Sequence, residues 1–91
     1  MSITIHLPTI LARLADGQKA LEARGETLGV VVADVASRYP QLGTRLRDEL
    51  GNPYPFVTYY LNDEDARFHG GFQAAVRDGD EVTVVPAIAG G

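Results

Sequence analysis

The 91-residue sequence predicts an α+β fold: a mixed sheet of four to five strands with one main helix packed on one face. The patterns most typical of strands lie at the two ends of the chain, and the one extended helical pattern lies between them. Hydrophobic residues make up 45% of the chain, which is typical of a globular protein, and this length is sufficient for one domain.

The N-terminal segment alternates apolar and polar residues. Ile3, Ile5 and Leu7 recur at every second position, which predicts a half-buried strand. The Asp-Gly pair at 16–17 is a turn signal, and residues 18–23 are predicted to form a second strand. Together they predict an N-terminal hairpin, although its connection is longer than two residues.

The central segment carries the helical pattern. Thr27 suits the N-cap position of a helix, and Pro40 is a stop signal. Between these two residues, apolar side chains recur at the spacing of one helix face: Leu28, Val31, Val32, Val35 and Tyr39. Valines are mediocre helix formers, so packing against the rest of the protein must stabilise this helix. A short second helix is predicted at 42–49.

The C-terminal half contains strand signals separated by turns. Residues 56–62 are rich in aromatic and β-branched side chains, which favours a strand. A turn is expected at 62–65, followed by a short strand at 66–68. The Asp-Gly-Asp sequence at 78–80 predicts a tight turn, and residues 81–85 predict the final strand.

Parallel pairing of the two terminal strands at the centre of the sheet, with the helix across one face, gives a β-grasp, or ubiquitin-like, roll. We expect this domain to span residues 1–85 and a flexible C-terminal tail to occupy residues 86–91. The predicted core contains Ile3, Ile5, Leu7, Leu21, Leu28, Val31, Val32, Val35, Val57, Tyr59, Leu61, Val82 and Val84.

Composition argues against several classes of function. The net charge of -4 argues against general nucleic-acid binding, which requires a basic surface. The chain has no cysteine, so it can form no disulfide and offers no thiol nucleophile. His6 and His69 lack the spacing of metal ligands, and we expect no metal site. No segment has the pattern of a secretion signal or a membrane span, so we expect a cytoplasmic protein with no membrane partner.

The last four residues are the candidate functional site. Gly90 and Gly91 have no side chains, so they can pass through a narrow channel into another protein's active site, followed by Ala89 and Ile88. An enzyme that uses ATP can convert a Gly91 carboxylate to an acyl-adenylate, from which a sulfur donor can form a thiocarboxylate. With no cysteine in the chain, any carried sulfur must sit on this carboxyl. The alternative is that small residues at a chain end simply fray.

The segment 78–91, from the Asp-Gly-Asp turn to Gly-Gly, resembles the C-terminus of the ubiquitin-like sulfur-carrier family. That family includes the small subunit of molybdopterin synthase and the thiamine-biosynthesis sulfur carrier. Three further stretches are most similar to the branch that supplies sulfur for cysteine synthesis in actinobacteria. They are Pro-Thr-Ile-Leu at 8–11, Gly-Gln-Lys at 17–19, and the stretch at 60–68 with the following Gly-Gly at 70–71.

The resemblance covers nearly the whole chain, and it implies a β-grasp fold and a thiocarboxylate on Gly91. It also implies a set of partners: an adenylating enzyme related to ubiquitin activators, a sulfur donor, a pyridoxal-phosphate-dependent cysteine synthase, and a zinc peptidase that releases the product. In this scheme ATP, pyridoxal phosphate and zinc belong to the partners. The chain itself binds no cofactor and is a carrier rather than an enzyme.

A docking surface for these partners is predicted on the face of the sheet that the helix leaves open. If Val57 and Tyr59 face the helix, the alternating side chains face away from it. The predicted partner-binding residues are Phe56, Thr58, Tyr60, Val85 and His6, with Thr4 and Thr83 on the same face. The alternative is that Phe56 and Tyr60 only cover the edge of the sheet.

Three alternative functions stay open. The chain could be the small subunit of a molybdopterin synthase, or a ubiquitin-like modifier joined to lysines of other proteins. It could also be a binding module whose tail plays no part. The sequence does not specify the final sulfur acceptor, because the acceptor chemistry lies on other proteins.

Overall fold

The computed structural model describes residues 2–87 of the chain. Its strands are β1 (Ile3–His6), β2 (Ala20–Ala23), β3 (Val57–Leu61), β4 (Glu64–Asp65) and β5 (Glu81–Pro86). Its α-helices are α1 (Thr9–Ala12), α2 (Leu28–Arg38) and α3 (Pro40–Leu46). Short 3₁₀ helices span Arg13–Ala15, Ala66–His69 and Gly71–Gln73.

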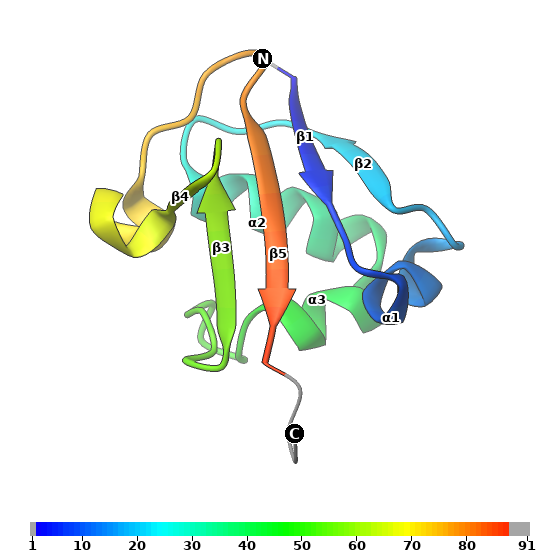
Figure 1. Cartoon of the computed structure of the whole chain (residues 1–91). Helices are drawn as coiled ribbons and strands as arrows, with labels where there is room; N and C mark the ends of the chain where they lie inside the picture. Colours follow the sequence, from blue (N-terminus) through cyan, green and yellow to red (C-terminus); the bar gives the residue numbers. More distant parts are fainter. Residues whose placement is uncertain (1, 88–91) are drawn as a thin grey trace.

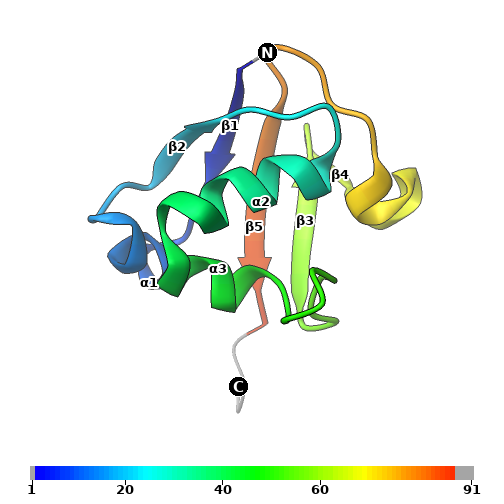
Figure 2. The same ribbon diagram turned by 180° about the vertical axis from the view of Figure 1, so that it is seen from behind.

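The five strands form one mixed sheet in the order β2-β1-β5-β3-β4 (Figure 1). The two terminal strands, β1 and β5, run parallel at its centre, with Ile5 opposite Val82. The other neighbouring pairs are antiparallel. Helices α2 and α3 lie across one face of the sheet, and the opposite face is open (Figure 2). The predicted β-grasp roll is confirmed.

The core lies between the sheet and α2. Ile3 and Ile5 of β1 have no exposed surface, and neither do the three valines of α2 that face them, Val31, Val32 and Val35. Full burial of such a side chain stabilises a fold by roughly 1.5–3 kcal/mol, which compensates for the low helix propensity of valine. Every predicted core residue is buried except Leu61, which is half-buried and packs at the margin.

The predicted N-terminal hairpin is confirmed, because β1 and β2 pair antiparallel, but β2 begins at Ala20 instead of residue 18. The connection between them contains α1 and a 3₁₀ turn, which no sequence pattern predicted. The Pro8 carbonyl accepts hydrogen bonds from the amides of Leu11 and Ala12, and both side chains are buried. A helix of four residues is barely one turn long, so it shows no repeating pattern in the sequence.

The prediction that Pro40 simply ends helical structure was incomplete. Pro40 is the first residue of α3, a position where its missing amide costs no hydrogen bond. The chain turns at Tyr39, which ends α2 and precedes α3, so the second helix covers 40–46 rather than 42–49. The two helices pack closely at Gly43, where an added Cβ would lie 2.6 Å from the Cβ of Ala36.

The strand that follows β3 was predicted to begin at residue 66, two residues later than in the structure. Asn62 and Asp63 both have positive φ angles, 50° and 74°, and form a two-residue turn. The strand β4 therefore begins at once, at Glu64. The segment predicted as a strand at 66–68 is a 3₁₀ helix, capped by the Asp65 carboxylate, which accepts a hydrogen bond from the Arg67 amide.

Candidate functional site

The candidate site begins where the central strand ends. β5 lies between β1 and β3, and its last residue, Pro86, pairs with Val57. The Ala87 amide then donates a hydrogen bond to the Phe56 carbonyl at 2.7 Å, so the sheet positions the chain through residue 87. β5 thus ends one residue later than predicted. The predicted site residues Ile88, Ala89, Gly90 and Gly91 lie outside the described residues.

The other end of β5 is anchored by the Asp-Gly-Asp turn. Asp80 accepts a hydrogen bond from the Asn62 side-chain amide at 3.0 Å and another from the Arg77 backbone amide at 2.8 Å. Both bonds hold the pKa of the Asp80 carboxyl below its ordinary value, and the bond from Asn62 has the larger effect. Asn62 also accepts from the Glu81 amide at 2.9 Å. The turn therefore ties the start of β5 to the β3–β4 turn.

The open face of the sheet brings the predicted docking residues together. The register places His6, Thr83 and Tyr60 in one row across β1, β5 and β3, and Thr58 opposite Val85 in the next row towards the tail. The residues that alternate with them in the three strands are buried towards the helices, apart from the half-buried Leu61 and Pro86. That these side chains contact a partner remains a prediction.

Two apolar side chains of this surface are well exposed. Val85 is 45% exposed and Phe56, just before β3, is 54% exposed. The Phe56 ring stacks on Tyr54, with ring centroids 4.9 Å apart and planes 15° from parallel. Stacking limits the motion of a side chain that water would otherwise surround on both faces. Phe56 is therefore an ordered apolar contact point beside the base of the tail.

His6 has a partner that no sequence pattern predicted. Its Nε2 atom lies 2.6 Å from Oε1 of Glu81, a residue 75 positions away in the chain. Both side chains are substantially exposed, so the pair contributes little to stability. It does fix the orientation of the imidazole on the open face. No local pattern could indicate this contact, because it depends on the parallel pairing of β1 with β5.

Two further observations concern residues 2–87 alone. Within this range, no three His, Asp or Glu side chains gather in a way that would hold a metal ion. Over the same range, none of the helices combines the length and apolar character needed to cross a membrane.

Comparison with known proteins assigns a family to this arrangement. The chain matches the ThiS family over residues 5–91. It is similar to the Mycobacterium tuberculosis protein named "Sulfur carrier protein CysO", with 46% identity over 93 aligned residues that cover 100% of both chains.

Two solved structures are similar in both sequence and fold. The crystal structure of Mycobacterium tuberculosis CysO, described as an antigen, aligns with a TM-score of 0.86 and 44% identity, covering 94% of this chain and 99% of that chain. A chain of the Amycolatopsis orientalis BexX/CysO complex aligns with a TM-score of 0.89 and 44% identity, covering 98% and 99%. With a family match over residues 5–91 and 46% identity along the full length, the chain belongs to the ThiS family of ubiquitin-like sulfur carriers.

Proposed function

We propose that this protein carries sulfur as a thiocarboxylate on Gly91. The observation that carries the proposal is the position of β5: the central strand of the sheet leads through Pro86 and the anchored Ala87 directly into Ile-Ala-Gly-Gly. The base of the tail therefore has a defined position on the molecule through Ala87. The full-length similarity to a protein named as a sulfur carrier supports the same conclusion.

The chemistry needs two steps at the Gly91 carboxyl group, an adenylyl transfer to its oxygen and then a substitution at its carbon. First, a carboxylate oxygen of Gly91 attacks the α-phosphorus of ATP, which forms the acyl-adenylate and releases pyrophosphate. A donor then supplies sulfide, HS⁻, whose sulfur attacks the acyl carbon, and AMP leaves with the electron pair of the broken C–O bond; the resulting thioacid loses its proton. The product is a thiocarboxylate. The carrier supplies the acyl group and a docking surface, and its partners supply the catalytic groups, so it acts as a co-substrate rather than as a catalyst.

The partners follow from this chemistry. We propose an adenylating enzyme, a sulfur donor and a final acceptor, with contacts to the open face at Phe56, Thr58, Tyr60, Val85 and His6. A related carrier in a described complex with BexX supports the general idea of a protein partner. For the acceptor we propose cysteine biosynthesis through a pyridoxal-phosphate-dependent synthase and a releasing zinc peptidase. ATP consumption by the activating step fits a cytoplasmic location.

Intact-protein mass spectrometry tests the proposal. The full chain is incubated with an adenylating enzyme, ATP and a sulfur donor, and we expect a species in which one oxygen is replaced by sulfur. Fragmentation should locate the change at Gly91. Reactions without ATP, and a variant lacking Gly90 and Gly91, serve as controls. If no thiocarboxylate forms with any matched adenylating enzyme, the proposal is wrong.

The final acceptor needs a separate experiment. With the thiocarboxylate form, a cysteine synthase and its amino-acid substrate, we expect a cysteinyl adduct on Gly91 that a zinc peptidase removes. Adducts on lysines of other proteins that survive a thiol reductant would favour a modifier instead. A stable complex with the large subunit of molybdopterin synthase would favour the remaining alternative.

A further inference from the structure

We infer that the partner-binding surface extends beyond the open sheet face to an apolar rim around the base of the tail, formed by Ile10, Leu50, Phe56 and Val85. This rim would dock against an apolar lip around the channel that receives the Gly-Gly tail in the adenylating enzyme. The inference rests on the proposed function and adds two residues outside the sheet, Ile10 and Leu50, to the predicted docking surface.

The topology brings the four side chains to one end of the molecule. Because β1 and β5 are parallel, α1 with Ile10 follows β1 at the same end where β5 leads into the tail. Because β3 is antiparallel to β5, Phe56 and the segment before it lie at this end as well. Figure 1 shows α1 on one side of the end of β5 and the connection from α3 to β3 on the other. Leu50 lies in that connection.

Leu50 lies in a hydrogen-bonded loop that keeps its side chain exposed. The Asp48 carboxylate accepts hydrogen bonds from the amides of Leu50 and Asn52, both at 2.9 Å. The Asp48 amide donates to the Asn52 carbonyl at 2.9 Å, and the Gly51 amide donates to the Asp48 carbonyl at 3.0 Å. This closed loop leaves the Leu50 side chain 86% exposed. An ordered loop that presents a leucine to solvent loses little conformational entropy when a partner covers it.

Ile10 is presented in a similar way by α1. The next two residues, Leu11 and Ala12, are buried and fix the orientation of the short helix, and Ile10 on its outer side is 66% exposed. Single exposed apolar residues are common in soluble proteins and need no explanation. Their distribution here is uneven: of six large, well-exposed apolar side chains in residues 2–87, four form this rim. The other two, Val30 and Phe68, lie on α2 and the 3₁₀ helix after β4.

The charges are distributed in a way that favours contact at the tail end. Carboxylates are concentrated towards the opposite end of the sheet, where Glu22, Asp63, Glu64, Asp78, Asp80 and Glu81 outnumber the arginines Arg24 and Arg77. The tail end carries both signs in nearly equal number: Arg13, Lys19, Arg45 and Arg47 with Asp16, Asp48 and Glu49. Forming a contact that excludes water costs less desolvation free energy where like charges do not accumulate, because each unpaired charge in the contact loses its hydration.

The test compares two surface substitutions with nearly identical starting exposure. Leu50→Ser removes a rim side chain that is 86% exposed, and Phe68→Ser removes one outside the rim that is 85% exposed. A double variant, Ile10→Ser with Leu50→Ser, enlarges the expected effect. Urea unfolding confirms that each variant is folded. The adenylating enzyme is titrated with each carrier, first for binding by calorimetry without ATP and then for thiocarboxylate formation.

For the double variant we expect binding weaker by about tenfold or more, with a matching rise in KM and little change in kcat. Phe68→Ser should bind within about twofold of the unsubstituted chain. Equal binding of the double variant and the unsubstituted chain overturns the rim, and so does a failure of the unsubstituted chain to bind. The proposed function fails on a different result, the absence of a thiocarboxylate on the unsubstituted chain.

Discussion

Asn62 links the end of β3 to the start of β5. Its φ angle of 50° starts the turn between β3 and β4, a conformation that asparagine tolerates better than most residues. Its side chain also bonds Asp80 and the Glu81 amide, 18 and 19 positions further along the chain. A single side chain thus fixes one hairpin and the entry into the central strand.

The Asp80 carboxylate provides a pH-dependent test of this link. Asp80→Ala removes two hydrogen bonds at a mostly solvated site, and we expect a loss of about 1 kcal/mol in the free energy of unfolding at pH 7. Because folding lowers the pKa of Asp80 below its ordinary value of 3.8, its stabilisation is present above that pH and disappears as the pH falls through the lower folded value. Urea unfolding at pH 7 and at about pH 3 measures both effects.

The control for this substitution is Glu49→Ala, which removes an exposed carboxylate near the other end of the sheet. It should change the free energy of unfolding by less than about 0.5 kcal/mol. A difference between Asp80→Ala and the unsubstituted chain that grows as the pH falls would contradict the assigned role of Asp80.

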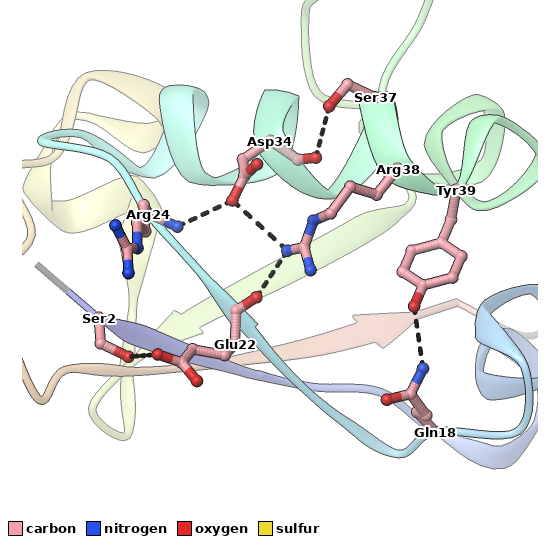
Figure 3. Close-up of polar contacts among 8 residues, drawn as sticks. All are labelled: Ser2, Gln18, Glu22, Arg24, Asp34, Ser37, Arg38 and Tyr39. Atoms are coloured by element: carbon pink, nitrogen blue, oxygen red, sulfur yellow. Dashed lines mark hydrogen bonds and ion pairs between the residues drawn. The ribbon is translucent and has the colours of Figure 1, made fainter.

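At the scale of elements, α2 does more than cover the sheet: its polar side chains close the outer edge of β2 (Figure 3). Arg38 donates to the Glu22 carbonyl at 2.6 Å, and Asp34 accepts from the Arg24 amide at 2.9 Å. Both backbone groups belong to, or directly follow, the strand at the edge of the sheet. An uncovered edge strand would offer such groups to another chain, so these bonds also protect against edge-to-edge association.

Asp34→Ala should open this edge. We expect hydrogen exchange at the Arg24 amide to become about tenfold faster, and the free energy of unfolding to fall by about 1 kcal/mol. Ser37→Ala is the matched control, since the Ser37 hydroxyl bonds only the Asp34 carbonyl of the same helix at 2.8 Å and should leave Arg24 exchange unchanged. Exchange at Arg24 that is equally slow in both variants would show that α2 does not protect the edge. Hydrogen exchange followed by NMR gives both rates.

A second link between elements joins β3 to the end of α3. The buried Tyr59 hydroxyl donates to the Leu46 carbonyl at 2.5 Å. Tyr59→Phe leaves that carbonyl without this donor, and we expect a loss of about 1–2 kcal/mol in the free energy of unfolding. Chemical unfolding at neutral pH measures it.

Alkaline pH gives an independent readout of the same bond. Burial raises the pKa of the Tyr59 phenol above its ordinary value of 10, while nearby Arg47 opposes part of the increase. Since the unfolded chain loses this proton first, the Tyr59 contribution is complete below pH 10 and declines as the pH rises above it. The stability difference between the unsubstituted chain and Tyr59→Phe should therefore narrow above pH 10, and a constant difference would contradict the assigned cause.

At the scale of the whole molecule, the core and the candidate site are separate parts of the chain. Within residues 2–87, every buried core residue lies between Ile3 and Val84, and the sheet positions the chain through Ala87. Deleting Gly90 and Gly91 should therefore shift the midpoint of thermal unfolding by less than about 2 °C, because the core of the described residues ends at Val84. The same deletion should abolish thiocarboxylate formation. A large fall in the unfolding midpoint would show that the last residues contribute to the fold.

The sequence by itself determined the terminal strands, the buried face of α2, the central parallel pair and the Gly-Gly tail as the candidate site. The terminal strands show a hydrophobic period of about two residues, and the buried face of α2 shows a period of about 3.6 residues. The Gly-Gly tail can be identified in the sequence without knowledge of any tertiary contact. The absence of cysteine likewise excludes a thiol side chain of this chain as the carrier of sulfur, a conclusion that depends on composition alone.

Only the tertiary structure decided α1, the start of α3 at Pro40 and the early β4 strand, because one or two turns of helix and a two-residue strand carry no measurable period. It also decided which distant residues come to the same place: His6 with Glu81, Asn62 with Asp80, and Ile10 with Leu50 at the end where β5 leads into the tail. These arrangements arise from the register in which strands far apart in the chain pair, and local sequence patterns do not encode that register.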